Sequence, residues 1–165
     1  MNEEKTLDIK GTSEEEERRM LSNFQEYSFV FDGVECASME GLLQSLKTKS
    51  IALQQEICQR SGIPAKNSFK KRWQNVRWKL TGILYWKGKP IRRRSDEYQY
   101  FLDRAYDALY TNPSFVSALV RAEGRKLTHS VGEHSTHKTV LTEYEFLSRL
   151  ERYRYLALRG VNKEN

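Results

Sequence analysis

Alternating hydrophobic and polar positions near the N-terminus predict a β-hairpin. Residues 27–31 are rich in aromatic and β-branched side chains, Asp32-Gly33 is a strong two-residue turn, and residues 34–37 return. Residues 7–10 are a further candidate for a short strand. Residues 11–19 are typical of a polar, acidic loop or the start of a helix.

Two helices are predicted after the hairpin. Ser38 is a favourable N-cap residue for a helix that runs to about Lys47. A second helix, over about residues 50–60, is expected to end at a serine and a glycine ahead of Pro64.

Three longer helical patterns follow in the second half of the chain. The first has apolar residues at the i, i+3, i+4, i+7 spacing of one buried face: Tyr98, Phe101, Leu102, Ala105 and Leu109. Asn112-Pro113 ends it and opens the second helix, which is expected to stop at Gly124. The third begins at Thr142, with Glu145 three residues later as in a capping box.

The remaining segments complete the predicted fold. The stretch after residue 60 is hard to interpret, and residues 82–91 favour a strand or loop over a helix. A chain of 165 residues and 19.5 kDa suits one domain. We predict a mainly helical α+β domain with a small N-terminal antiparallel sheet. Residues 1–20 form its first strand and acidic loop, 21–158 its body, and 159–165 a flexible tail.

The composition excludes several classes of protein. Charged residues make up 30% and aromatic residues 12%, with apolar residues spread along the chain, which argues against disorder. No apolar run approaches the roughly 18 residues of a membrane span, and no apolar signal core is visible. Cys36 and Cys58 do not make a disulfide framework. We expect a protein of the cytoplasm, or of the host cytoplasm if it is viral, that does not bind membranes.

The charge is unevenly distributed. The net charge of +6 divides into −5 for residues 1–60 and +11 for residues 61–165. No acidic residue lies between Glu56 and Asp96, where there are twelve basic ones, interleaved with Phe69, Trp73, Trp78, Tyr85 and Trp86. Because cations hold phosphates and aromatic rings stack on bases, this segment favours a nucleotide or nucleic-acid ligand. The alternative is a solvated basic face whose aromatic residues lie in the core.

The helix after Ser38 carries three polar residues beside its apolar face. Glu40, Gln44 and Lys47 follow the i, i+4, i+7 spacing, which aligns a carboxylate, an amide and an amine. A catalytic carboxylate is one interpretation. The alternative is structural, since the helix dipole favours an anion in the first turn and a cation in the last by roughly 0.3–1 kcal/mol each.

Short motifs recur around this helix and downstream of it. They are Leu21-Ser22-Asn23-Phe24, the Asp32-Gly33 turn, Ser38-Met39-Glu40, Gln44 with Lys47, Pro64-Ala65-Lys66, Asn112-Pro113 and Leu127-Thr128-His129-Ser130. In this order they resemble the NADAR (YbiA-like) family, from about residue 21 to residue 154. Gly41 replaces a usual histidine, and residues 131–142 replace the C-terminal signature, so the resemblance is to a divergent member.

The resemblance implies an N-glycoside hydrolase that cleaves a ribosyl–base C–N bond in a phosphorylated, nucleotide-like substrate. Family substrates include ribosylamino-pyrimidine phosphates and ADP-ribose attached to guanine in nucleic acid. Glu40 would activate water or stabilise the oxocarbenium-like state, and Lys47 could instead attack the ribose C1. The expected ligand-binding residues are Asn23, Phe24, Gln44, Lys66, Tyr85, Trp86, Arg92, Arg94 and His129.

Other residues leave alternatives open. Glu133 is a candidate second carboxylate, whereas Glu145 is assigned to the capping box. His129, His134 and His137 lack the paired spacing of zinc sites, so we expect neither a metal nor a cofactor. The alternative function is non-catalytic binding of a nucleotide, ADP-ribose or nucleic acid through residues 60–94. The sequence leaves the oligomeric state open.

Overall fold

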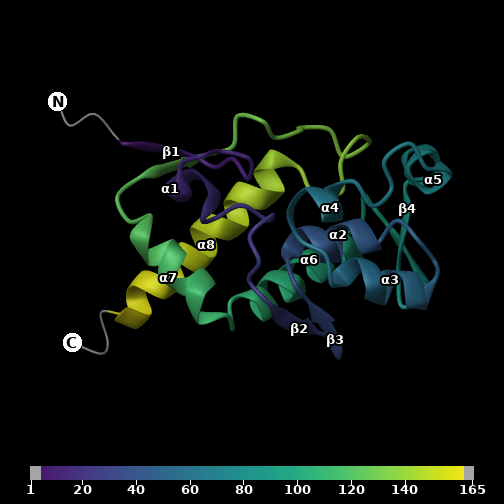
Figure 1. Cartoon of the computed structure of the whole chain (residues 1–165), viewed down its shortest axis with the longest axis horizontal. Coiled ribbons are helices and arrows are strands. Elements are labelled where there is room, and N and C mark those ends of the chain that lie inside the picture. Colours follow the sequence, from purple (N-terminus) through teal and green to yellow (C-terminus); the bar gives the residue numbers. More distant parts are fainter. Residues whose placement is uncertain (1–4, 162–165) are drawn as a thin grey trace.

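Short strands alternate with helices in the first part of the chain, and helices dominate its last third (Figure 1). A computed structural model describes residues 5–161. The elements in chain order are β1 (Thr6–Asp8), α1 (Glu16–Arg19), β2 (Phe29–Phe31), β3 (Val34–Cys36), α2 (Met39–Ser45), α3 (Ile51–Cys58), α4 (Gly62–Lys66), α5 (Trp73–Thr81), β4 (Ile83–Trp86), β5 (Lys89–Arg92), α6 (Asp96–Leu109), α7 (Pro113–Arg121), β6 (Lys126–Thr128) and α8 (Glu143–Val161). The predicted mainly helical α+β class is confirmed.

The strands form three separate two-stranded sheets. β2 and β3 make the predicted hairpin, in which Asp32 and Gly33 both have positive φ, as a tight hairpin turn requires. β4 and β5 form a second hairpin around Lys87-Gly88 with the same signature. β1 pairs in parallel with β6, joining Leu7 to Leu127, a partner that the sequence did not indicate.

The helix starts follow the predicted capping residues. Ser38 accepts a hydrogen bond from the backbone N–H of Gly41, and Asn112 caps α7 ahead of its proline. Thr142 and Glu145 form a reciprocal capping box at the start of α8. α7 ends at Arg121, slightly earlier than the predicted Gly124.

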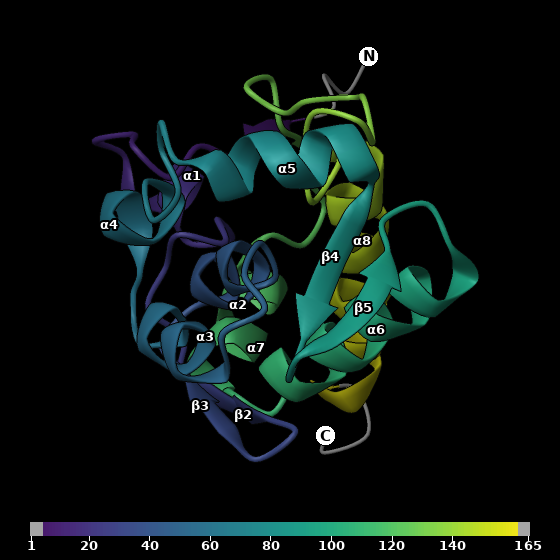
Figure 2. The same ribbon diagram turned by 90° about the vertical axis from the view of Figure 1, so that its right-hand side faces the viewer.

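The unassigned stretch after residue 60 contains α4 and α5. Both are short, and most of their side chains are exposed; Ala65 is the one buried residue of α4 and Trp78 that of α5. They therefore lack the apolar repeat by which a helix is recognised in a sequence. Figure 2 shows α5 along the outside of the molecule, beside the start of β4.

The core gathers around α6 and α8. α6 packs against β2 and β5, while α8 packs against α7 and β6. The predicted stripe of α6 is buried from Tyr98 to Leu109. Phe146, Leu150 and Tyr153 lie on the buried side of α8, and Leu147 is half-buried against the same core.

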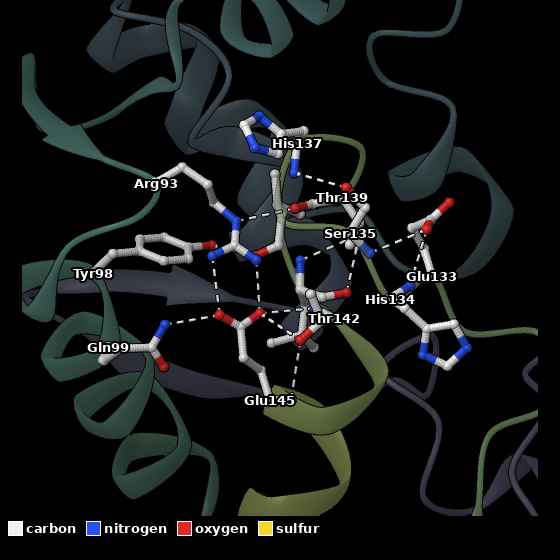
Figure 3. Close-up of polar contacts among 12 residues, drawn as sticks. Arg93, Tyr98, Gln99, Glu133, His134, Ser135, His137, Thr139, Thr142 and Glu145 are labelled. Carbon is white, nitrogen blue, oxygen red and sulfur yellow. Dashed lines mark hydrogen bonds and ion pairs between the residues drawn. The ribbon is translucent and has the colours of Figure 1, made fainter.

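Arg93, the residue after β5, and Glu145 of α8 form a buried ion pair (Figure 3). Arg93 is 1% exposed, and its two terminal nitrogens donate to the two oxygens of Glu145 at 3.0 and 2.6 Å. Burial alone would raise the pKa of Glu145, but hydrogen bonds from Arg93, Thr142 and Gln99 outweigh it, so the pKa lies below its usual value. The pair therefore stays ionised at neutral pH.

Residues 1–4 of the predicted N-terminal segment and 162–165 of the predicted tail lie outside the described residues, and α8 continues to Val161. Among residues 5–161, no helix is both long and apolar enough to cross a membrane.

Glu145→Ala is expected to lower the free energy of unfolding by about 3–5 kcal/mol, because it leaves the Arg93 guanidinium buried without a counter-charge. Glu151→Ala on the same helix is the control, since Glu151 pairs with Arg154 near solvent and should cost less than about 1 kcal/mol. Urea unfolding measures both. Equal losses in the two variants would contradict the importance of the ion pair.

Candidate active site

A pocket of about 400 Å³ opens between α2, the 10–12 loop and the 131–142 loop. It contains Glu40 together with polar, cationic and aromatic side chains from distant parts of the chain. Its lining includes Lys10, Gly11, Ser22, Asn23, Phe24, Glu40, Leu43, Gln44, Lys66, His129, Gly132, Glu133, Lys138, Thr142 and Phe146. Of the expected site residues, Asn23, Phe24, Glu40, Gln44, Lys66 and His129 therefore lie in one cavity.

Asn23 and Phe24 are anchored to α2 and α4 through their backbone. The Glu40 N–H donates to the Asn23 carbonyl at 3.1 Å, and the Gly62 N–H donates to the Phe24 carbonyl at 3.1 Å. The hydroxyl of buried Tyr106 donates to Oδ1 of Asn23 at 2.9 Å. Because that oxygen is occupied, the amide NH₂ of Asn23 is the group left to donate to a ligand.

Glu40 and Gln44 lie one helical turn apart on α2. The Gln44 amide donates to Oε1 of Glu40 at 2.9 Å, whereas the buried Oε1 of Gln44 has no partner among the described residues. Burial raises the pKa of Glu40, and the Gln44 hydrogen bond and the charges of Lys47, Lys66 and His129 offset this only in part. The site thus holds a carboxyl that gains a proton more readily than an ordinary glutamate, and an amide oxygen that can accept from a ligand.

Gly41 sets the position of α2. A Cβ at this position would lie 2.5 Å from the Arg60 carbonyl oxygen and 2.9 Å from that of Ile57. These are backbone atoms at the end of α3, which cannot move aside. A histidine at position 41 therefore has no room, and the glycine lets α2 approach α3 closely.

His129 reaches the pocket through the β1–β6 pairing. Its Nδ1 lies 2.7 Å from the Ile9 carbonyl oxygen, an acceptor, so Nδ1 carries the proton and Nε2 is left for a ligand. Asp8 fixes the following turn by accepting from the backbone N–H and the hydroxyl of Ser130, both at 2.8 Å. Burial opposes ionisation, but these bonds and that from Arg18 lower the pKa of Asp8 to about 2.

Three lysines give the pocket a positive potential. Lys66 comes from α4 and its Nζ lies 5.6 Å from the centre of the Phe24 ring, while Lys10 and Lys138 come from loops. The described carboxyls in the lining are Glu40 and Glu133. Glu133 is exposed, and hydrogen bonds from the N–H groups of Ser135 and His134 lower its pKa. The pocket therefore suits an anionic ligand.

Lys47 lies behind the pocket and not among its lining residues. Its Nζ donates to Oδ1 of Asn75 at 3.0 Å and sits 5.8 Å from the Trp78 ring. Burial lowers the pKa of Lys47 to about 8, against the opposing effect of the Glu40 charge. Lys47 thus acts on Glu40 through its charge.

The other four expected residues also lie elsewhere. Trp86 is 7% exposed in the core, beside Phe31 and Phe101, where its ring cannot stack on a base. Tyr85 packs against Arg77. Arg92 and Arg94 line a separate hollow with Thr81, Gly82 and Ile83.

Lys10 and Lys138 are pocket residues that the sequence analysis missed. Both lie in loops without a motif, and they approach the same cavity only because β1 pairs with β6 and α8 begins nearby. No local signal marks either one. Within residues 5–161, no three His, Cys, Asp or Glu side chains lie close enough together to hold a metal ion.

Comparison with known proteins gives the family. The family model described as "Bacteriophage protein GP30.3" matches residues 17–155. An uncharacterized 17.1 kDa protein from the Gp30-rIII intergenic region of Enterobacteria phage T4 is 35% identical over 129 residues, covering 77% of this chain and 83% of that protein. No solved structure matches the chain.

The resemblance to the NADAR family is wrong, since the matching family is that of the phage protein. Several of the motifs behind it have structural roles that different folds share. Ser38 caps α2, Asp32-Gly33 makes a tight hairpin turn, and Asn112 caps α7. Any function must therefore be argued from the pocket.

Lys47→Met is expected to change how stability depends on pH. The pKa of Lys47 is about 8 in the folded protein against an ordinary value of 10.5, so between these values the unfolded chain binds more protons and stability rises with pH. The contribution is about 2 kcal/mol between about pH 8 and 10. Denaturant unfolding should show that the variant lacks this rise and that Lys49→Met, at an exposed position, keeps it. Identical profiles for all three proteins would contradict the burial of a titrating amine.

Proposed function

The chain belongs to the bacteriophage protein GP30.3 family, and we propose that it is an N-glycoside hydrolase acting on the ribosyl–base C–N bond of a phosphorylated, nucleotide-like substrate. The observation that carries the proposal is the Glu40 carboxyl, with its raised pKa, in a pocket that also holds an aromatic ring and three lysines. This combination provides a base, a surface for stacking and a site for phosphate.

Glu40 is the proposed catalytic residue. Cleavage of a ribosyl C–N bond passes through an oxocarbenium-like state, which a nearby carboxylate stabilises. A water molecule adds its oxygen to C1 of the ribose and gives its proton to Glu40. A carboxylate with a raised pKa is the stronger base for this step.

The departing base needs a proton, and in this proposal His129 supplies it. Its Nδ1 is held by the Ile9 carbonyl, so a protonated ring donates through Nε2. Phe24, with Lys66 over one of its faces, offers a flat apolar surface to a heterocycle. The amide of Asn23 would donate to the ribose hydroxyls.

The lysines would hold the phosphate. Lys10, Lys66 and Lys138 reach the pocket from three different segments, so they can surround an anion. Lys47 is not assigned as the nucleophile, because its Nζ donates a hydrogen bond to Asn75 and does not line the pocket. Since the family is a bacteriophage family, we place this activity in the cytoplasm of the infected host.

Glu40→Gln is expected to reduce turnover at least a hundredfold while ligand affinity stays within a few-fold, because the amide keeps the shape but cannot take a proton. The substrates are a nucleoside monophosphate, a ribosylamino-pyrimidine phosphate and ADP-ribosylated guanine DNA, with mass spectrometry to detect the released base. Glu35→Gln, an exposed carboxyl on β3, is the control and should leave turnover unchanged. Wild-type turnover by Glu40→Gln would exclude Glu40; binding without release by the wild type would indicate a non-catalytic nucleotide-binding protein.

The pH profile gives a separate test. Glu40 must be ionised to act as a base, so activity should fall on the acidic side at a pH above the ordinary glutamate pKa of about 4.3. Gln44→Leu removes a hydrogen bond that lowers the pKa of Glu40, so this limb should move to higher pH. Gln55→Leu, at an exposed position of α3, should leave it in place. A limb that stays fixed or moves to lower pH in Gln44→Leu would contradict the assignment.

A further inference from the structure

The outer side of α5 carries an exposed apolar stripe. Trp73, Val76 and Leu80 follow the i, i+3, i+7 spacing of one helix face and are 64%, 57% and 81% exposed. Trp78, on the opposite side, is the buried residue of this helix. Side chains of this size on one face, without cover from the rest of the described chain, mark a contact surface.

Basic residues adjoin this stripe in the chain. Lys70, Lys71 and Arg72 lead into α5 and Lys79 lies within it, and all four are exposed. Within residues 5–160, none of these four cations forms an ion pair. No acidic residue lies between Glu56 and Asp96 to neutralise them. We call these four cations, together with Trp73, Val76 and Leu80, the α5 face.

Trp73 is held in place by a stack of cations and rings. The guanidinium of Arg77 lies 5.0 Å from the centre of the Trp73 ring and 4.8 Å from that of Tyr85 on β4. Arg77 is fixed in turn by a 2.9 Å hydrogen bond to the Lys47 carbonyl oxygen. Lys49 covers Tyr85 at 5.3 Å. The Trp73 ring is thus positioned before any ligand binds, and most of its surface stays open.

We propose that the α5 face binds single-stranded nucleic acid, with a base stacked on Trp73 and backbone phosphates on the four cations. An ordered, exposed aromatic ring among unpaired cations is the arrangement that single strands use. A duplex hides its bases and could not use Trp73. A membrane surface would need a broader apolar face than three side chains on a nine-residue helix. The proposal stands apart from the proposed hydrolase, although Lys66 of the pocket lies only a few residues before the α5 face.

Fluorescence anisotropy with a labelled 15-nucleotide single-stranded DNA tests the proposal. The wild type should bind, with log affinity falling against log salt at a slope of about −3 for four phosphate contacts. Trp73→Ala should weaken binding about tenfold, as expected for the loss of one stacked base. The triple variant Lys70→Ala/Lys71→Ala/Arg72→Ala should make the slope shallower by about 2. Glu35→Gln, at an exposed position on β3 outside the pocket and the α5 face, should bind like the wild type. Because the assay measures binding and not turnover, failure of the hydrolase proposal would not change how this result is interpreted.

The matched control is Lys126→Ala/Arg152→Ala/Arg159→Ala, which removes the same charge from exposed positions on β6 and α8. It should bind nearly as tightly as the wild type. Absence of binding, or an equal loss in the control and in the Lys70/Lys71/Arg72 variant, would overturn the proposal. It would also be overturned if a duplex of the same sequence bound as tightly as the single strand, or if the protein bound anionic phosphatidylglycerol vesicles in preference to DNA.

Discussion

The buried ion pair between Arg93 and Glu145 fixes the wall of the pocket. Arg93 also donates from Nε to the Thr139 carbonyl at 3.0 Å, and Glu145 accepts from the Thr142 N–H at 2.8 Å (Figure 3). Thr139 and Thr142, in the last part of the 131–142 loop, are therefore both tied to one pair of charges. Because a single buried charge is costly, neither residue can leave the other without a large loss, and the wall is confined to one arrangement.

A second part of the pocket lining depends on a contact between distant parts of the chain. β1 and β6 are joined in parallel, and Asp8 at the end of β1 receives bonds from Ser130 and Arg18. This pairing carries the 10–12 loop and His129 to the same cavity. The pocket is thus closed by two long-range constraints, one an ion pair and one a strand pair. Glu40 comes from α2, and α2 can pack closely against α3 because Gly41 has no side chain.

The features that the sequence predicts well are local. Each depends on interactions between residues close together in the sequence, so a short stretch of sequence is enough to predict it. Examples are the Asp32-Gly33 turn, the cap at Ser38 and the apolar stripe of α6. The β1–β6 pairing depends on residues about 120 positions apart and leaves no local pattern. The sequence analysis also grouped Glu40, Gln44, Asn23 and His129, and these four residues do line one pocket. The family resemblance that connected them was wrong, so their roles in binding and catalysis stay predictions. Trp86 and Arg92 were expected from the family resemblance and from the basic, aromatic composition of their segment, and neither shows which side chains are buried or which ones face the pocket.

The twelve cations between Glu56 and Asp96 show why composition alone does not locate a binding site. The fold gives them different tasks: Arg93 neutralises a buried carboxylate, Arg77 packs between two rings, and Lys66 lines the pocket. Those that lead into α5 remain in solvent without partners. A cation that is already paired adds little to the potential felt by a ligand, whereas an unpaired one adds all of its charge. Unpaired positive charge of the segment therefore remains both at the pocket, through Lys66, and on the α5 face, and these two places can be tested separately by variants that leave the core unchanged.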